Sequence, residues 1–517
     1  MKSKTIRSIR QVFQVLSFIL FIGLLFFAGS LPSSHSLASL FLRLDPLTAL
    51  TSMLASRSWI PHLGVAILTV LVTLVFGRVW CGWFCPMGSL LDWITPRHRK
   101  PAKTGSKTVS ERWRIVKYFL LLLMIVTALF GIQSFSFLDP ISLLTRSMAG
   151  AVIPAARTVI FSSLDVLYQV EFLYAPLDFL YQYLVYPLFK EVIPSFELAV
   201  PIFIFFAAIL GLNWVAERFW CRYLCPLGGL LGLLSRISLF RRVVNQDCTG
   251  CGLCARRCPT GTINPDQNYQ SDPAECTVCY DCVADCSKGG TRFQWMLPGW
   301  KPASSQSYDI KRREAVLALG AGVASAALAG VEPIQRRQPA NLIRPPGART
   351  TDFESLCIRC GECIKVCPTQ GLQPTLLEAG WQNALTPRLV PRLGQCSFNC
   401  NACGTVCPTG AIPFLSIAEK QQKPIGLARV DQSRCLPWAY DVPCIVCEEM
   451  CPLPDKAIRL HEVETTNSQG ETILLQRPYV VKEYCIGCGI CEYKCPMGGE
   501  AAIRVFAPTD PGGFISQ

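Results

Sequence analysis

The sequence is poor in charged residues and lacks several cofactor motifs. Only 16% of its 517 residues are Asp, Glu, Lys or Arg, against about 25% in ordinary soluble domains. No Cys-x-x-Cys-His motif occurs, which excludes covalently bound haem c. There is neither a glycine-rich dinucleotide fingerprint nor a phosphate loop, which argues against direct use of NADH. Of the four histidines, His35, His98 and His461 fit no metal-ligand pattern.

The sequence is instead rich in long apolar segments. Half of the residues are hydrophobic and the net charge is +13. Because the basic residues crowd the ends of the apolar runs, we interpret this charge as a positive-inside bias and expect no nucleic-acid partner. Spans are predicted at about 12–28, 63–76, 118–130 and 199–212. The first run could be a signal peptide, but its length favours an uncleaved helix with a cytoplasmic N-terminus.

Part of the apolar region is duplicated. Residues 41–55 read FLRLDPLTALTSMLA and residues 137–149 read FLDPISLLTRSMA, and each copy leads to a span that ends in Trp-Cys-x3-Cys-Pro. The same order in both copies predicts two helix pairs related by an axis along the membrane normal. Arginine and lysine after each copy predict that the paired cysteines face the cytoplasm and the Leu-Asp-Pro segments face outward. Tyr and Phe in the insertion at 152–201 favour amphipathic helices at the outer interface.

Of the 28 cysteines, 24 fall into six runs with the spacing of 4Fe–4S ligands. In the first two runs, each final cysteine is expected to ligate the other run's cluster. The predicted sets are Cys248, Cys251, Cys254 with Cys286, and Cys276, Cys279, Cys282 with Cys258. The four later runs are Cys357, Cys360, Cys363, Cys367; Cys396, Cys400, Cys403, Cys407; Cys435, Cys444, Cys447, Cys451; and Cys485, Cys488, Cys491, Cys495. Two pairings of these four runs stay open. Either the first run exchanges its final cysteine with the fourth and the second with the third, or neighbouring runs exchange theirs in order. Six clusters and no disulfide are therefore predicted.

The remaining cysteines form two identical pairs, Cys81 with Cys85 and Cys221 with Cys225. On a helix, residues four apart share one face, so the repeat could bring both pairs together as a four-thiolate site. Such a site suits a metal ion or a seventh cluster. A dithiol–disulfide pair, or close packing of small side chains, is the alternative.

The predicted architecture is a membrane α-helical domain of four helices in two repeated pairs, with a fifth helix and α+β ferredoxin-like modules. Arg312 and Arg313 before the apolar run 315–331 resemble a twin-arginine leader, while a fifth span or a buried helix that leaves the whole chain cytoplasmic is the alternative. Short strands are expected at 479–481 and 502–505. The predicted boundaries are 1–242 for the duplicated domain, 243–295 for a two-cluster module, 308–331 for the leader or helix, 332–350 for a linker, and 351–517 for a four-cluster module.

Residues 1–290 resemble the NapH-type membrane ferredoxins, with four spans, two Cys-x3-Cys-Pro motifs and a two-cluster module in the same order. Residues 311–517 resemble the NapG-type ferredoxins, with a twin-arginine leader and four cluster runs. The resemblance implies a fusion in the bacterial cytoplasmic membrane that passes electrons from the quinone pool to a periplasmic redox partner such as nitrate reductase. The first module would be cytoplasmic and the last one periplasmic.

Quinol oxidation requires a proton acceptor near an apolar site. Asp45, His62 and Asp139 are the ionisable candidates near the predicted outer edge of the membrane, although Asp before Pro is more often a cap or turn residue. Two functions stay open. One is a quinol-oxidising electron-transfer protein, and the other is an assembly factor that reduces a metal or cofactor, as the similar Cys-x3-Cys-Pro units of nitrous-oxide-reductase accessory proteins and cupric reductases suggest.

Overall fold

The computed structural model describes residues 3–27, 37–95, 111–170, 172, 174–186, 196–296, 312–331, 342–348, 353–377, 380–466 and 472–507. The chain forms two compact units. The first unit comprises Met1–Phe27, Ser36–Ser147 and Pro201–Ala329, and the second comprises Ala28–His35, Met148–Val200 and Gly330–Gln517. Each unit is described below by itself. His35 and His98, which fit no ligand pattern in the sequence, lie outside the described residues.

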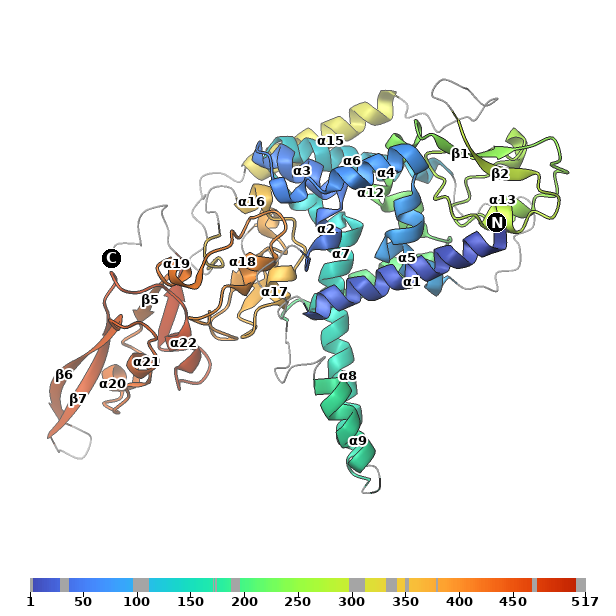
Figure 1. Cartoon of the computed structure of the whole chain (residues 1–517). Helices are drawn as coiled ribbons and strands as arrows, with labels where there is room; N and C mark the ends of the chain where they lie inside the picture. The colour runs from blue at the N-terminus through green and yellow to red at the C-terminus, as the bar shows by residue number, and fades with distance from the viewer. Residues whose placement is uncertain are drawn as a thin grey trace. The chain divides into compact units, whose positions relative to one another are not determined.

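The first unit is built from apolar helices and one small sheet, and Figure 1 shows α3, α4, α6 and α12 side by side. Its helices and turns are α1 Ser3–Phe27, α2 Leu40–Arg43, α3 Pro46–Ser56, η1 Pro61–Leu63, α4 Ala66–Phe76, η2 Trp80–Phe84, α5 Pro86–Ile94, η3 Glu111–Arg114, α6 Ile115–Leu129, η4 Ser134–Leu138, α7 Pro140–Ser147, α11 Ala199–Gly211, η8 Leu212–Trp214, η9 Trp220–Leu224, α12 Pro226–Ser235, α13 Leu253–Arg256, η10 Pro265–Gln267, α14 Asp281–Ala284 and α15 Arg312–Val331.

The duplication seen in the sequence is present in the fold. In both copies the aspartate of Leu-Asp-Pro precedes a helix that starts at the proline, α3 or α7. Both copies also place a π-turn, η2 or η9, directly before a helix that starts at the proline of Cys-Pro. Proline suits the first helical position because it lacks the N–H that would otherwise be unsatisfied there. Both helix starts therefore follow from the local sequence.

The predicted spans form helices, but most are shorter than a bilayer requires. Of the described helices, two are long and apolar enough to cross a membrane, Thr5–Phe26 and Pro140–Leu167. By contrast, α4 has 11 residues, α6 has 15 and α11 has 13, against the about 20 residues that a span normally needs. The long helix at Pro140–Leu167 differs from the separate interfacial helices expected after residue 152, because its apolar residues continue through that boundary. The structure thus supports the four-helix membrane arrangement only weakly.

The first two-cluster module belongs to the first unit. It begins at β1 Phe240–Val244, which pairs antiparallel with β2 Thr291–Trp295, so the strands bring the two ends of the module together. Three ion pairs attach it to α1: Arg7 Nε lies 3.2 Å from Asp281, Arg7 NH1 lies 3.3 Å from Asp285, and Arg10 NH2 lies 3.4 Å from Asp281. The basic N-terminus, which the sequence explained by membrane topology alone, therefore also holds this module.

The second unit contains the four later cysteine runs between short helices and three two-stranded sheets. Its described elements are η5 Met148–Val152, α8 Ile153–Leu167, α9 Tyr174–Leu180, η7 Tyr181–Val185, α16 Phe353–Leu356, α17 Glu362–Lys365, β3 Leu372–Pro374, η11 Trp381–Asn383, β4 Pro387–Leu389, α18 Ala402–Val406, α19 Ile417–Gln421, β5 Leu427–Val430, α20 Leu436–Ala439, α21 Val446–Glu449, β6 Ile458–Thr466, β7 Thr472–Val480, α22 Ile490–Lys494 and β8 Ile503–Phe506. The antiparallel pairs are β3–β4, β5–β8 and β6–β7. Strands β7 and β8 confirm the strands predicted near 479 and 503.

The insertion of the second repeat packs on this second unit. Arg388 NH2 lies 2.9 Å from the Glu197 carboxylate, and the Glu197 amide donates to Gln373 Oε1 at 3.2 Å. The predicted domain boundary at residue 242 does not account for this contact, because the insertion at 148–200 groups with the C-terminal residues and not with the helices that surround it in sequence.

Candidate iron–sulfur sites

The first module places its cysteines in two sets. A cavity of about 30 Å³ is lined by the four thiols of site 1: Cys248, Cys251, Cys254 and Cys286. In site 2, the Cys258 thiol acts electrostatically on each of three others: Cys276, Cys279 and Cys282. Each set combines three cysteines of one run with the last cysteine of the other, which is the arrangement that the spacing predicts.

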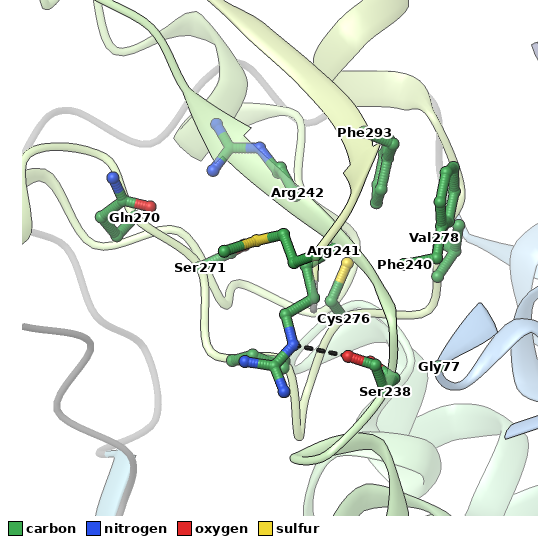
Figure 2. Close-up of a pocket in the computed structure, with 12 residues that line it drawn as sticks. Gly77, Ser238, Phe240, Arg241, Arg242, Gln270, Ser271, Cys276, Val278 and Phe293 are labelled. Carbon is green, nitrogen blue, oxygen red and sulfur yellow. Dashed lines mark hydrogen bonds between the residues drawn. The ribbon is translucent and has the colours of Figure 1, made fainter. Parts of the chain in front are cut away.

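A smaller cavity borders site 2, and Figure 2 shows Cys276 among the residues around it, with Phe240 and Phe293 on one side and Gln270 on the other. Arg241 Nε donates to the Ser238 carbonyl at 2.7 Å beside it. The cavity encloses about 20 Å³, which is room for about one water molecule. Because Cys276 is its one cysteine, we interpret it as a margin of site 2 and not as a separate ligand site.

In the second unit, neighbouring runs exchange their last cysteines. One cavity is lined by the four thiols of site 4: Cys396, Cys400, Cys403 and Cys367. A second cavity is lined by those of site 5: Cys435, Cys444, Cys447 and Cys495. The sequence left two pairings of these runs open. The structure favours the exchange between neighbouring runs over the exchange of the first run with the fourth and the second with the third.

The other two sets follow the same rule. Site 3 consists of Cys357, Cys360 and Cys363 with Cys407. Site 6 consists of Cys485, Cys488 and Cys491 with Cys451.

The four sites of the second unit form a line. Cys363 of site 3 is close enough to Cys403 of site 4 for their charges to interact. The Cys396 amide of site 4 donates to the Cys488 carbonyl of site 6 at 2.8 Å. Cys491 of site 6 interacts in the same way with Cys447 of site 5. The order in space is therefore 3, 4, 6 and 5, which differs from the order in sequence.

The donor sets fit iron–sulfur clusters. All 28 cysteines lie among the described residues, and none forms a disulfide. Burial raises the pKa of Cys276 to about 11 and that of Cys447 to about 12, so iron would bind these thiols by displacing their protons. In the described part of the chain, no three His, Cys, Asp or Glu side chains are placed to hold a single metal ion. The six sets suit clusters, whose thiolate ligands are spread over separate iron atoms.

The structure brings the two cysteine pairs together. Cys81, Cys85, Cys221 and Cys225 are all buried, and each pair acts electrostatically on the other. The expectation that each pair lies on one α-helical face is wrong. The Cys85 amide donates to the Trp80 carbonyl at 2.9 Å, which makes a π-turn, and Cys85 then becomes the N-cap of α5. The reason is Pro86, which has no N–H to continue the α-helical ladder.

Helix α1 satisfies the carbonyl groups that this break releases. The Gly82 carbonyl would normally accept from residue 86, but residue 86 is proline, and Gln14 Nε2 donates to it at 3.0 Å. Ser17 Oγ donates to the Phe84 carbonyl at 2.6 Å. Gly82 also touches the first module, since a Cβ atom there would lie 2.2 Å from the Thr277 carbonyl oxygen. The paired cysteines therefore lie where α1, the repeat and the first module meet.

Two buried arginines flank the four cysteines, and the sequence analysis did not identify them. Arg78 acts on Cys81 and Cys225, while Arg218 acts on Cys221 and on Cys279 of site 2. Each arginine stands three residues before the first cysteine of its pair, so the repeated motif is Arg-x-Trp-Cys-x3-Cys-Pro. This repetition was the signal in the sequence. The cations favour negative charge on thiolates or on a group that they hold.

Each arginine also has a buried carboxylate partner. Arg218 Nε lies 2.5 Å from Asp92 Oδ1. Arg78 NH1 lies 3.3 Å from Glu275 Oε2, and Lys117 Nζ donates to the same oxygen at 2.6 Å. Because Glu275 precedes Cys276 of site 2, this ion-pair network ties the first module to the helices that carry the paired cysteines.

The three candidate proton acceptors lie in two different settings. Asp45 and Asp139, one from each repeat, are buried and interact with each other. His62 lies exposed in turn η1. The structure thus brings the two aspartates together and leaves the histidine at the surface.

Comparisons with known proteins give the class. Family models described as 4Fe-4S binding domain match residues 60–104 and 198–245, which hold the paired cysteines, and residues 242–264. A model described as 4Fe-4S dicluster domain matches residues 356–412, which hold sites 3 and 4. No solved structure matches the chain. The protein is a 4Fe–4S iron–sulfur protein of the ferredoxin type.

The relatives give the family. The methylamine utilization ferredoxin-type protein MauM of Methylorubrum extorquens is 39% identical over 171 residues, covering 32% of this chain and 73% of the relative. MauM of Methylobacillus flagellatus is 36% identical over 218 residues, covering 40% and 84%. The ferredoxin-type protein NapG of Escherichia coli is 34% identical over 197 residues, covering 37% and 82%. The chain belongs to this family of NapG and MauM ferredoxin-type proteins. The resemblance of residues 1–290 to NapH-type proteins stays a prediction.

Proposed function

We propose that the protein is a membrane-bound electron carrier that oxidises quinol and passes the electrons through six 4Fe–4S clusters to a redox protein outside the cytoplasmic membrane. The observation that carries the proposal is the continuous line of sites 3, 4, 6 and 5 in the second unit. A storage or purely structural role would not need neighbouring clusters to touch through their ligand loops, as they do at Cys396 and Cys488.

The paired cysteines are the proposed relay of the first unit. Four buried thiols lie together, and the same arginine, Arg218, acts on Cys221 and on Cys279 of site 2. We assign a further iron–sulfur centre to these cysteines. It would supply one-electron transfer, while Arg78 and Arg218 would balance the negative charge of its thiolates.

The proposed topology places the N-terminus and the first module in the cytoplasm and residues 351–517 in the periplasm. Two contacts support it. The ion pairs of Arg7 hold the N-terminus and the first module on one side, and the Glu197–Arg388 pair holds the insertion and the C-terminal residues together. Reporter fusions after Met296 and after Gln517 test this topology, and both reporters on the same side would overturn it.

The acceptor is proposed only by its class. The relatives include proteins named for methylamine utilization as well as NapG, so a nitrate reductase is one of several acceptors that fit. The acceptor would bind near site 3 or site 5, because these sites form the two ends of the line.

The deciding experiment uses the full chain in lipid nanodiscs. Addition of a short-chain ubiquinol or menaquinol should bleach the cluster absorbance and produce the EPR signals of reduced clusters, as dithionite does. Reduction by dithionite but not by either quinol would reject quinol oxidation. A variant with Cys488→Ala should still accept electrons from quinol but should reduce an added acceptor more slowly, because the line is broken at site 6.

A further inference from the structure

The two repeats place a pair of aspartates in the protein interior. Asp45 is 0% exposed and Asp139 is 1% exposed. Each uses one carboxylate oxygen to cap the helix that follows. Asp45 Oδ1 accepts from the Leu47 amide at 2.7 Å, and Asp139 Oδ2 accepts from the Ser142 amide at 2.9 Å. One oxygen of each carboxylate is therefore accounted for by helix capping.

The other oxygen of each aspartate is buried without a geometrically aligned donor among the described residues: Asp45 Oδ2, Asp139 Oδ1 and the Ser142 hydroxyl all lack one there. The two carboxyl groups are nevertheless close enough to interact with each other, and Asp139 also interacts with Ser142. The strongest influences on the two carboxyl groups are burial, the other carboxyl and the capping amides. Of the charged side chains on neighbouring elements, Arg43 Nε donates to Ser39 Oγ and Arg146 NH2 donates to the Phe137 carbonyl.

Two ionised carboxylates in this position would repel each other, and each would bury an unsatisfied oxygen, which is unfavourable. One proton removes both problems, because a protonated oxygen of one aspartate can donate to the free oxygen of the other. We propose that Asp45 and Asp139 hold a single shared proton and form the proton-accepting site of quinol oxidation. This inference rests on the proposed function.

The proposed step balances. Quinol loses two electrons and two protons as it becomes quinone. The electrons pass one at a time to oxidised clusters, one proton converts the aspartate pair from singly to doubly protonated, and the second proton leaves to water. The pair later releases its extra proton to the outer aqueous phase, which returns it to the singly protonated state.

The test uses full-length Asp45→Asn and Asp139→Asn variants, because asparagine still caps a helix but cannot share a proton in this way. Asp165→Asn is the matched control, since Asp165 is an exposed aspartate on α8. Infrared spectra of the wild-type protein at neutral pH should contain the carbonyl stretch of a protonated buried carboxyl group. The wild-type-minus-variant difference spectrum should contain this band for both variants and should lack it for the control. A difference spectrum without the band for both variants, or a wild type without any such band, overturns the shared proton.

Kinetics test the catalytic half of the proposal. Quinol-driven cluster reduction should fall by about 100-fold in either variant, while reduction by dithionite and the iron content should not change. Equal quinol rates in wild type and variants would overturn the proton-accepting role. A wild-type protein that quinol fails to reduce would instead reject the proposed function, and the infrared band would still decide whether the proton is shared.

Discussion

At the scale of single residues, the first unit contains buried charges that compensate one another, and the sequence pattern did not reveal them. Arg78 and Lys117 are buried cations that share one carboxylate, Glu275. A buried ion network contributes little net stability compared with apolar packing, but removing one partner leaves the other charges uncompensated. Glu275 is therefore a residue whose loss should weaken the docking of the first module.

Replacement of Glu275 by glutamine should destabilise the first unit by about 3–5 kcal/mol, because Arg78 and Lys117 stay buried without a counter-charge. Denaturant titration followed by loss of cluster absorbance measures the effect. Glu448→Gln is the control, since Glu448 pairs with the partly exposed Lys456 at 2.7 Å, and pairs of this kind contribute at most about 1 kcal/mol. Equal shifts for both variants would show that the buried network has no special role.

At the scale of elements, the exchange of a final cysteine between neighbouring runs is the organising feature. In sequence, the short strands β3 and β4 lie between the run that ends at Cys367 and the run that begins at Cys396. Their pairing folds the chain back so that Cys367 reaches site 4. Strand β5 precedes the run that begins at Cys435, and β8 follows the run that ends at Cys495. Their pairing likewise brings the start of one run close to the end of the other. Each pair of runs thus forms one module that cannot assemble from a single run.

Double substitutions test this exchange. Cys407→Ala should remove the cluster of site 3 and lower the iron content by about four atoms per chain. Adding Cys360→Ala, which belongs to the same site, should remove no further iron. Adding Cys400→Ala, which belongs to site 4, should remove about four more. If the variant that combines Cys407→Ala with Cys400→Ala lost only about four iron atoms, while the variant with Cys360→Ala lost about eight, each run would hold its own cluster and the assigned exchange would be wrong. Elemental analysis and acid-labile sulfide provide the measurement.

At the scale of the whole molecule, the number of redox centres decides between a simple ferredoxin pair and a relay. Six sites predict about 24 iron atoms per chain, and a seventh centre at the paired cysteines raises this to about 28. Four buried thiols lie together with two buried arginines in the first unit, and this combination of ligands and counter-charge fits such a centre.

The Cys81→Ala and Cys221→Ala double variant should therefore lose about four iron atoms while the EPR signals of the other clusters persist. Gly211→Ala is a suitable control, because a Cβ atom at Gly211 would touch nothing within 4 Å. Unchanged iron in the double variant would identify the paired cysteines as a dithiol and would remove the proposed relay. Maturation of another enzyme that stops in this variant, while quinol oxidation continues, would favour the assembly function.

The sequence alone determined the cluster chemistry, because ligand spacing is local. Cys-x2-Cys-x2-Cys-x3-Cys places three thiols around one cluster and directs the fourth away whatever the rest of the chain does. The duplication, the helix starts at Pro46, Pro86 and Pro140, and the strands near 479 and 503 were predictable for the same reason.

Only the tertiary structure decided which parts come together over long distances. It selected neighbouring runs as partners, ordered the sites as 3, 4, 6 and 5, and placed the insertion at 148–200 with the C-terminal residues. It also brought Asp45 to Asp139 and Glu275 to Arg78, which are separated by 94 and 197 positions. Such contacts depend on how apolar surfaces pack and how buried charges find partners, and no local spacing records either.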